Sequence, residues 1–140
     1  MAQSAYALLE AKLGVEGIRS DNDLAALVEK RLPSSSVKAL VRGGLTDAEA
    51  WHLIVPRRTL AHRIARREPL SRDESDKAVR VARLVAQAEQ VFADPERAWR
   101  WMRKPKQQFG GRSPLDLLAT DAGGRLVEEL LTQIDHGMAA

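Results

Sequence analysis

The sequence of 140 residues contains no cysteine. This excludes disulfide bonds, thiolate metal sites and a cysteine nucleophile, and it is consistent with a reducing cytosol. Aromatic residues make up only 4% of the chain, and β-branched residues are few beside alanine, leucine, arginine and glutamate. That balance favours helices over sheets, and no alternating strand pattern of useful length is present. We therefore expect an all-α protein.

Long apolar runs are also absent. No stretch approaches the roughly 20 apolar residues that a membrane span requires. The N-terminal segment MAQSAYALLEAKLG lacks the basic residues and long apolar core of a secretory signal. The apolar fraction of 44% and the charged fraction of 29% are ordinary for a globular domain. We expect a cytoplasmic protein that does not bind membranes.

The chain has no recognisable arrangement of catalytic or cofactor-binding residues. Its histidines, His52, His62 and His136, are scattered, without the spacing of metal ligands. The segment GGRSPLDLLATDAGGR, residues 110–125, lies between two glycine pairs, but it lacks the Lys-Ser/Thr or G-x-G-x-x-G pattern of a phosphate-binding loop. We expect no catalytic residues, no metal site and no cofactor, and hence no enzyme.

Helix starts and stops are strongly marked. Thr46 with Glu49, and Ser71 with Glu74, have the spacing of capping boxes. The dipeptides 94–95 and 113–114 each place a capping side chain before a proline that suits the first helical position. Together with apolar residues at helical spacing, these signals predict helices within residues 20–33, 34–44, 45–55, 56–68, 69–94, 94–105, 113–120 and 123–137.

The helices predicted at 45–55 and 56–68 have the length and spacing of a helix-turn-helix. In the first, Ala50, Leu53 and Ile54 are predicted to pack inward, and in the second Leu60 and Ile64 form the inner face. The second helix lies in a basic region, since residues 55–83 hold nine Lys/Arg and four Asp/Glu. A basic region of this kind is expected where a protein contacts phosphates. An arginine-rich surface helix or a protein interface is the alternative explanation.

The helix at 56–68 would present its outer face to DNA. In a recognition helix the N-terminal residues approach base edges in the major groove. Arg57 or Arg58 could donate two hydrogen bonds to guanine, and Thr59 or His62 could reach a base edge or a phosphate. The later arginines suit phosphate contacts. The predicted DNA-binding residues are Arg57, Arg58, Thr59, His62, Arg63 and Arg66.

Two runs of the sequence resemble the Xre/MbcA/ParS family of antitoxins. The first is RRTLAHR followed by LSRDESDKAVRVARL, and the second, more specific run is GGRSPLDLLATDAGGRLVEELL. The resemblance covers about residues 20–138. It implies an Xre-like helix-turn-helix domain followed by a small helical toxin-binding domain. It also implies a homodimer that binds the operator DNA of its own operon and a RES-domain toxin that consumes NAD⁺, in a type II toxin–antitoxin module.

The resemblance also implies a domain organisation. Residues 1–19 would form an N-terminal arm, either helical or loose, 20–93 the DNA-binding and dimerisation domain, and 94–140 the toxin-binding domain. In this family the C-terminal segment covers the entrance to the active site of the toxin. Carried over by matching position, the toxin-binding residues are Arg112, Ser113, Pro114, Leu115, Leu118, Gly123, Gly124, Arg125, Ile134, Asp135, His136 and Gly137. The basic segment RKPKQQF, residues 103–109, departs from the family pattern, so its contacts stay open.

An antitoxin that neutralises a RES-domain toxin and represses its operon is the function that these features predict. A stand-alone helix-turn-helix regulator, whose C-terminal part only dimerises, is the alternative. The C-terminal residues 113–140, with one Arg and five Asp/Glu, could complement a basic cleft that binds a dinucleotide.

Overall fold

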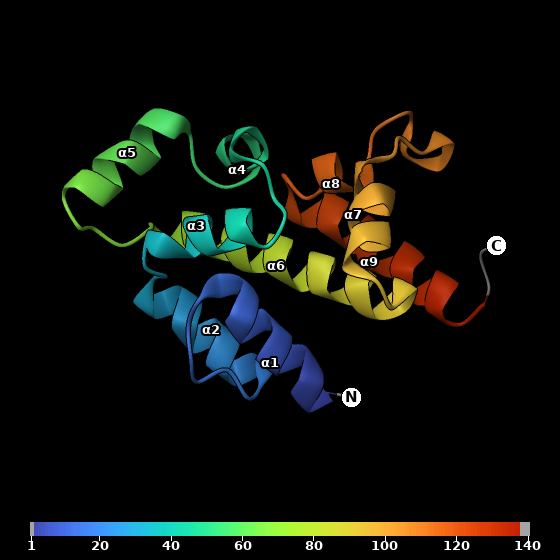
Figure 1. Cartoon of the computed structure of the whole chain (residues 1–140), viewed down its shortest axis with the longest axis horizontal. Coiled ribbons are helices and arrows are strands. Elements are labelled where there is room, and N and C mark those ends of the chain that lie inside the picture. The colour runs from blue at the N-terminus through green and yellow to red at the C-terminus, as the bar shows by residue number, and fades with distance from the viewer. Residues whose placement is uncertain (1, 138–140) are drawn as a thin grey trace. The chain divides into compact units, whose positions relative to one another are not determined.

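The computed structural model describes residues 2–137, and the regular elements in that range are all helices (Figure 1). The all-α prediction is therefore confirmed. The chain divides into two compact units, Met1–Ala82 and Arg83–Ala140, and the boundary falls within one long helix. Across residues 2–137, every helix is too short or too polar to cross a membrane.

The first unit is built from short helices with well-defined starts. Both predicted capping boxes are present: the Thr46 side chain accepts the N–H of Glu49 at 3.1 Å, and the Ser71 side chain accepts the N–H of Glu74 at 3.0 Å. In each pair the glutamate returns a bond to the N–H of its partner, at 2.9 and 2.8 Å. The helices of this unit are α1 (Ala2–Leu13), α2 (Asp21–Lys30), α3 (Ser35–Arg42), α4 (Asp47–Leu53), α5 (Arg57–Ala65) and the first part of α6 (Arg72–Phe92).

Helix α1, in the segment expected as an N-terminal arm, packs against α3. Its Leu9 and Leu13 are buried. The fully buried hydroxyl of Ser36 on α3 donates to the carbonyl of Leu13 at 2.7 Å, which satisfies a polar group inside the core. Helix α1 therefore contributes to the core of the first unit.

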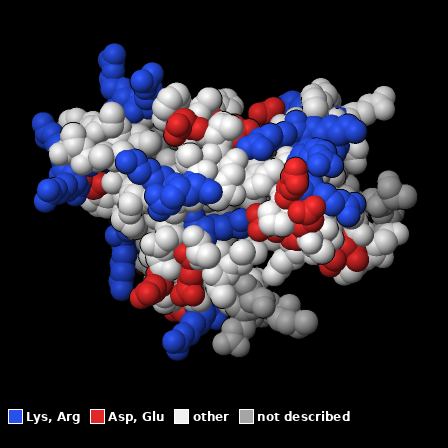
Figure 2. All heavy atoms as spheres, in the orientation of Figure 1, with Lys and Arg blue, Asp and Glu red and all other residues white. Residues whose placement is uncertain are grey.

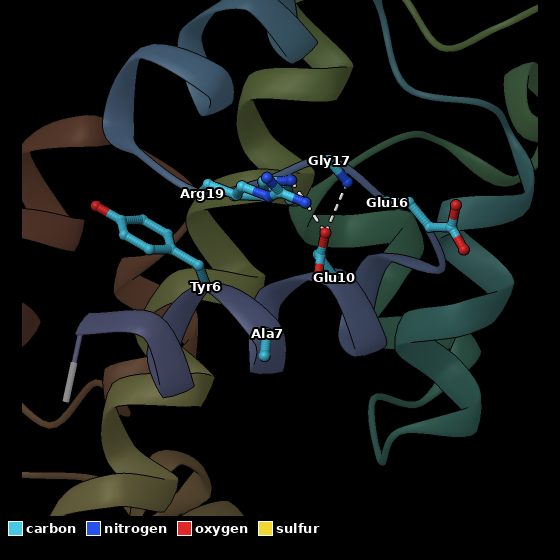
Figure 3. A pocket seen from close by; sticks show the side chains of 7 residues that line it. Tyr6, Ala7, Glu10, Glu16, Gly17 and Arg19 are labelled. Carbon is cyan, nitrogen blue, oxygen red and sulfur yellow. Dashed lines mark hydrogen bonds between the residues drawn. The ribbon is translucent and has the colours of Figure 1, made fainter.

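The Glu10 carboxylate binds two backbone N–H groups of the loop after α1. Glu10 accepts hydrogen bonds from the backbone N–H groups of Gly17 and Ile18, at 2.6 and 3.0 Å (Figure 3). Residues of α1 and of this loop line a solvent-open cavity of about 850 Å³. Since the Glu10 carboxylate is already occupied by amides of its own chain, its role is to fix the loop.

Helices α4 and α5 follow one another across a short break and form the predicted helix pair (Figure 1). Ala50, Leu53 and Ile54 are buried as expected, and so is Leu60. The prediction that Ile64 also faces inward is wrong, because 39% of this residue is exposed. Ile64 lies in the last turn of α5, which ends at Ala65. Leu60, one turn earlier, is the buried residue of this helix. Helix α5 also begins at Arg57, one residue after the predicted start.

The second unit contains the rest of α6, α7 (Pro95–Arg103), the 3₁₀ helix η1 (Gln107–Phe109), α8 (Pro114–Leu117) and α9 (Asp121–Asp135). The predicted caps are confirmed, since Asp94 accepts the N–H of Glu96 and Ser113 accepts the N–H of Asp116, both at 3.1 Å. Helix α8 contacts both α7 and α9. The core of the unit includes Leu84, Val85, Ala86, Ala88, Ala98, Trp99, Met102, Phe109, Leu115, Leu117, Leu118, Val127, Leu130 and Leu131.

The glycine pair at 123–124 is not a helix boundary, contrary to prediction. The N-cap of α9 is Thr120, whose side chain accepts the N–H of Gly123 at 3.0 Å, so both glycines lie in the first turn of the helix. They are buried, and a Cβ on Gly123 would overlap the carbonyl oxygen of Leu117. Gly123 therefore allows α9 to approach α8 of the same chain.

Candidate functional site

The outer face of α5 is basic and accessible. Arg57, Arg58, His62 and Arg66 are exposed, and Thr59 is half-buried. Lys and Arg side chains gather over this helix in Figure 2. The structure thus brings most of the predicted DNA-binding residues to one helix surface. Basic side chains arranged in this way suit phosphates and base edges.

Arg57, at the start of α5, is held by a tryptophan of α4. Its guanidinium carbon lies 5.1 Å from the centroid of the Trp51 ring, within the range of a cation–π interaction. Trp51 is half-buried. The contact orients Arg57 at the N-terminal end of α5, the end predicted to meet base edges. The spacing of the residues did not indicate this role for Trp51.

Arg63 differs from the other arginines of α5 because its guanidinium is already engaged. Its Nε and Nη2 atoms donate to the two carboxylate oxygens of Glu74 at 3.1 and 3.2 Å, and Nη1 lies 3.4 Å from Glu68. Burial raises the pKa of Glu74, but hydrogen bonds from Arg63 and Ser71 outweigh it, so this pKa lies below its ordinary value. The pair ties α5 to the start of α6.

In the second unit the predicted toxin-binding residues separate into two groups. One group contributes to the core or the caps of the unit: Ser113, Pro114, Leu115, Leu118, Gly123 and Gly124 are buried. The other group is accessible: Arg112, Arg125, Asp135, His136 and Gly137 are exposed, and Ile134 is half-buried. The buried residues shape this surface, and only the accessible ones can contact a partner without rearrangement of the unit.

A shallow groove of about 280 Å³ lies along α8 and the start of α9, and Arg112 and Leu126 are part of its lining. Arg112 is oriented by a hydrogen bond from its Nε to the carbonyl of Phe109, at 3.1 Å. Leu126 is 46% exposed, although its spacing placed it in the apolar stripe of α9. An exposed leucine beside an oriented arginine is the kind of surface that protein interfaces use. The prediction from sequence did not include Leu126 in the toxin-binding set.

The acidic C-terminal part is partly neutralised within its own unit. Glu128 forms an ion pair with Arg83 at 2.6 Å, and Asp121 forms one with Arg125 at 2.7 Å. The other acidic side chains of α9, Glu129 and Asp135, are exposed. Among residues 2–137, no three His, Asp or Glu side chains are grouped so that they could hold a metal ion.

Two family matches coincide with these two surfaces. Residues 23–83 match the antitoxin Xre-like helix-turn-helix domain. Residues 87–137 match the Antitoxin Xre/MbcA/ParS C-terminal toxin-binding domain. The first match contains α4 and α5, and the second contains α7, α8 and α9.

Curated relatives extend the likeness over nearly the whole chain. An antitoxin Xre of Pseudomonas putida is 40% identical over 132 residues, which is 94% of this chain and 82% of the relative. A protein of Sphingobium named Prs ADP-ribosylating antitoxin is 29% identical over 84% of this chain and 81% of its own length. An antitoxin Xre of Yersinia enterocolitica is 32% identical over 60% of this chain and 57% of its own length. The chain therefore belongs to the Xre/MbcA/ParS family of antitoxins, with a helix-turn-helix domain and a C-terminal toxin-binding domain.

Proposed function

We propose that this antitoxin neutralises a RES-domain toxin that degrades NAD⁺, and that it does so by covering the entrance to the active site of the toxin. It acts by binding rather than by catalysis. The observation that carries the proposal is the exposed groove of α8 and α9 within the matched toxin-binding domain. An apolar residue, Leu126, is accessible in this groove, and Arg112 belongs to the same lining, so the surface offers both apolar area and charge to a partner.

The same chain would repress its own operon. The outer face of α5, with Arg57, Arg58, His62 and Arg66 exposed, would enter the major groove of operator DNA. We assign DNA binding and homodimerisation to residues 20–93 and toxin binding to residues 94–140, and we place both activities in the cytoplasm. Arg63 would position α5 through Glu74 and would not contact a phosphate directly.

Co-expression of this chain with a RES-domain toxin tests the proposal. The toxin alone should arrest growth and deplete cellular NAD⁺, and the antitoxin should restore both and co-purify with the toxin. Co-purification without recovery of NAD⁺ would contradict the proposed mode of inhibition. A chain that binds DNA but neither binds nor neutralises the toxin would be a stand-alone regulator.

A further inference from the structure

The second unit carries a basic cluster that neither proposed surface includes. Between residues 97 and 112 the chain has six Lys/Arg and no Asp/Glu. Four of these cations, Arg97, Arg100, Lys104 and Lys106, line one hollow of about 240 Å³ together with Trp101 and Phe92. We name these four residues the basic cluster. In Figure 2, Lys and Arg side chains gather over α7 and the segment that follows it.

Aromatic rings hold one member of the cluster, Lys106, in place. The Lys106 ammonium lies 4.9 Å from the centroid of the Trp101 ring, and Phe92 packs against the same tryptophan at 5.5 Å between centroids. The backbone around Lys106 is also fixed: its N–H donates to the carbonyl of Arg112 at 3.1 Å, and its carbonyl accepts the N–H of Gly111 at 3.0 Å. The charge of Lys106 is therefore preorganised beside the other three.

The cluster has no internal counter-charge. None of its four cations forms an ion pair with the residues that the structure describes, and Asp94 at the start of α7 is occupied by its cap. Burial and the neighbouring charge of Lys104 lower the pKa of Lys106. Cations gathered at this density repel one another, and an external anion would relieve that repulsion.

We propose that the basic cluster of the toxin-binding domain binds phosphates of duplex DNA, as a second contact separate from α5. This inference rests on the proposed DNA-binding function. Lysine is depleted at the cores of protein interfaces, whereas Lys and Arg supply phosphate contacts. A protein that binds DNA through α5 alone would leave these clustered cations without an anionic partner. The chemistry that they recognise is the phosphate backbone, independent of base sequence.

The test is the salt dependence of DNA binding by the full chain. The cluster variant removes three charges through Arg100→Gln, Lys104→Gln and Lys106→Gln. The matched control variant removes three exposed cations of the first unit through Arg19→Gln, Lys30→Gln and Lys38→Gln. Affinity for a duplex without operator sequence is measured between about 50 and 200 mM salt. Each phosphate contact contributes about 0.9 to the slope of log affinity against log salt.

We expect the cluster variant to reduce that slope by about 2 to 3 and to weaken binding at least tenfold, with unchanged Tm and toxin affinity. The control variant should change the slope by less than 1. If the wild-type chain binds DNA and the cluster variant keeps the wild-type slope, this inference is wrong and the proposed function stands. If toxin affinity falls instead, the cluster contacts the toxin. If the wild-type chain binds no DNA, both the inference and the proposed repression are wrong.

Discussion

Arg63 and Glu74 form a bidentate ion pair, with nitrogen–oxygen distances of 3.1 and 3.2 Å. The same carboxylate also accepts the N–H of Ser71 at 2.8 Å and so closes the capping box of α6. One side chain thus caps a helix and anchors the helix that carries the predicted DNA-binding residues. The pair anchors the end of α5, where Ile64 is exposed, whereas Leu60 packs into the core nearer the start of the helix.

We predict that Arg63→Ala lowers the Tm by about 3 °C or more, because it leaves the Glu74 carboxylate without its main partner. Operator affinity should fall as well, since α5 loses its connection to α6. Thermal unfolding followed by circular dichroism measures the first effect. The control is Arg66→Ala, an exposed arginine of the same helix region, which should shift the Tm by no more than about 1–2 °C. Equal Tm values for the two variants would contradict the anchoring role.

The contribution of this pair should depend on pH. The pKa of Glu74 in the folded chain lies below its ordinary value, and the unfolded value is about 4.3. The stabilisation is therefore complete above about pH 4.3 and is lost as the pH falls through the folded-state pKa. The Tm difference between wild type and Arg63→Ala should be largest at pH 7 and should shrink by pH 3. A difference that is constant over this range would show that the ionised carboxylate is not responsible.

Gly123→Ala should destabilise the second unit by about 1–3 kcal/mol, because the added Cβ overlaps the backbone carbonyl of Leu117 and forces α8 and α9 apart. Toxin affinity should fall with it, since the groove is built on these two helices. Gly43→Ala is the control, because a Cβ at that negative-φ position meets only ordinary contacts. Chemical unfolding measures both variants, and equal stabilities would contradict the close approach.

Arg58→Ala should weaken operator binding by about 1–3 kcal/mol and should reduce the salt slope by up to about 1, because it removes an exposed cation from the DNA-facing side of α5. Arg42→Ala, which removes an exposed arginine of α3, is the control. Fluorescence anisotropy with labelled operator at several salt concentrations measures both. Operator binding that is unaffected by Arg58→Ala would exclude this residue from the interface.

Features that depend on local sequence were predicted well. The capping boxes at Thr46 and Ser71, and the proline-assisted starts after Asp94 and Ser113, are all present, because a cap needs only residues within one helical turn. The helix pair of α4 and α5 follows from the same signals. These local interactions fixed the all-α fold and the order of its helices.

Features that depend on tertiary contacts were missed. Apolar spacing indicates that Ile64 and Leu126 share a periodic pattern with core residues, but it does not say how far the neighbouring helices extend over them. Spacing also gave no sign that Arg63 would pair with Glu74, eleven positions away in the chain. The burial of Gly123 depends on the approach of α8, which adjacent glycines in a sequence do not reveal.

The central claim is that the groove around Leu126 binds the toxin and the face of α5 binds DNA. Leu126 and Ile64 are large exposed apolar residues, one in each unit, so they provide a matched pair. Toxin affinity of Leu126→Gln and Ile64→Gln, measured by titration calorimetry, tests the claim most directly. Leu126→Gln should raise the Kd for the toxin about tenfold or more, because it places a polar amide in an apolar contact, and Ile64→Gln should leave it unchanged. Equal toxin affinities for the two variants, or a loss confined to Ile64→Gln, would contradict the assignment.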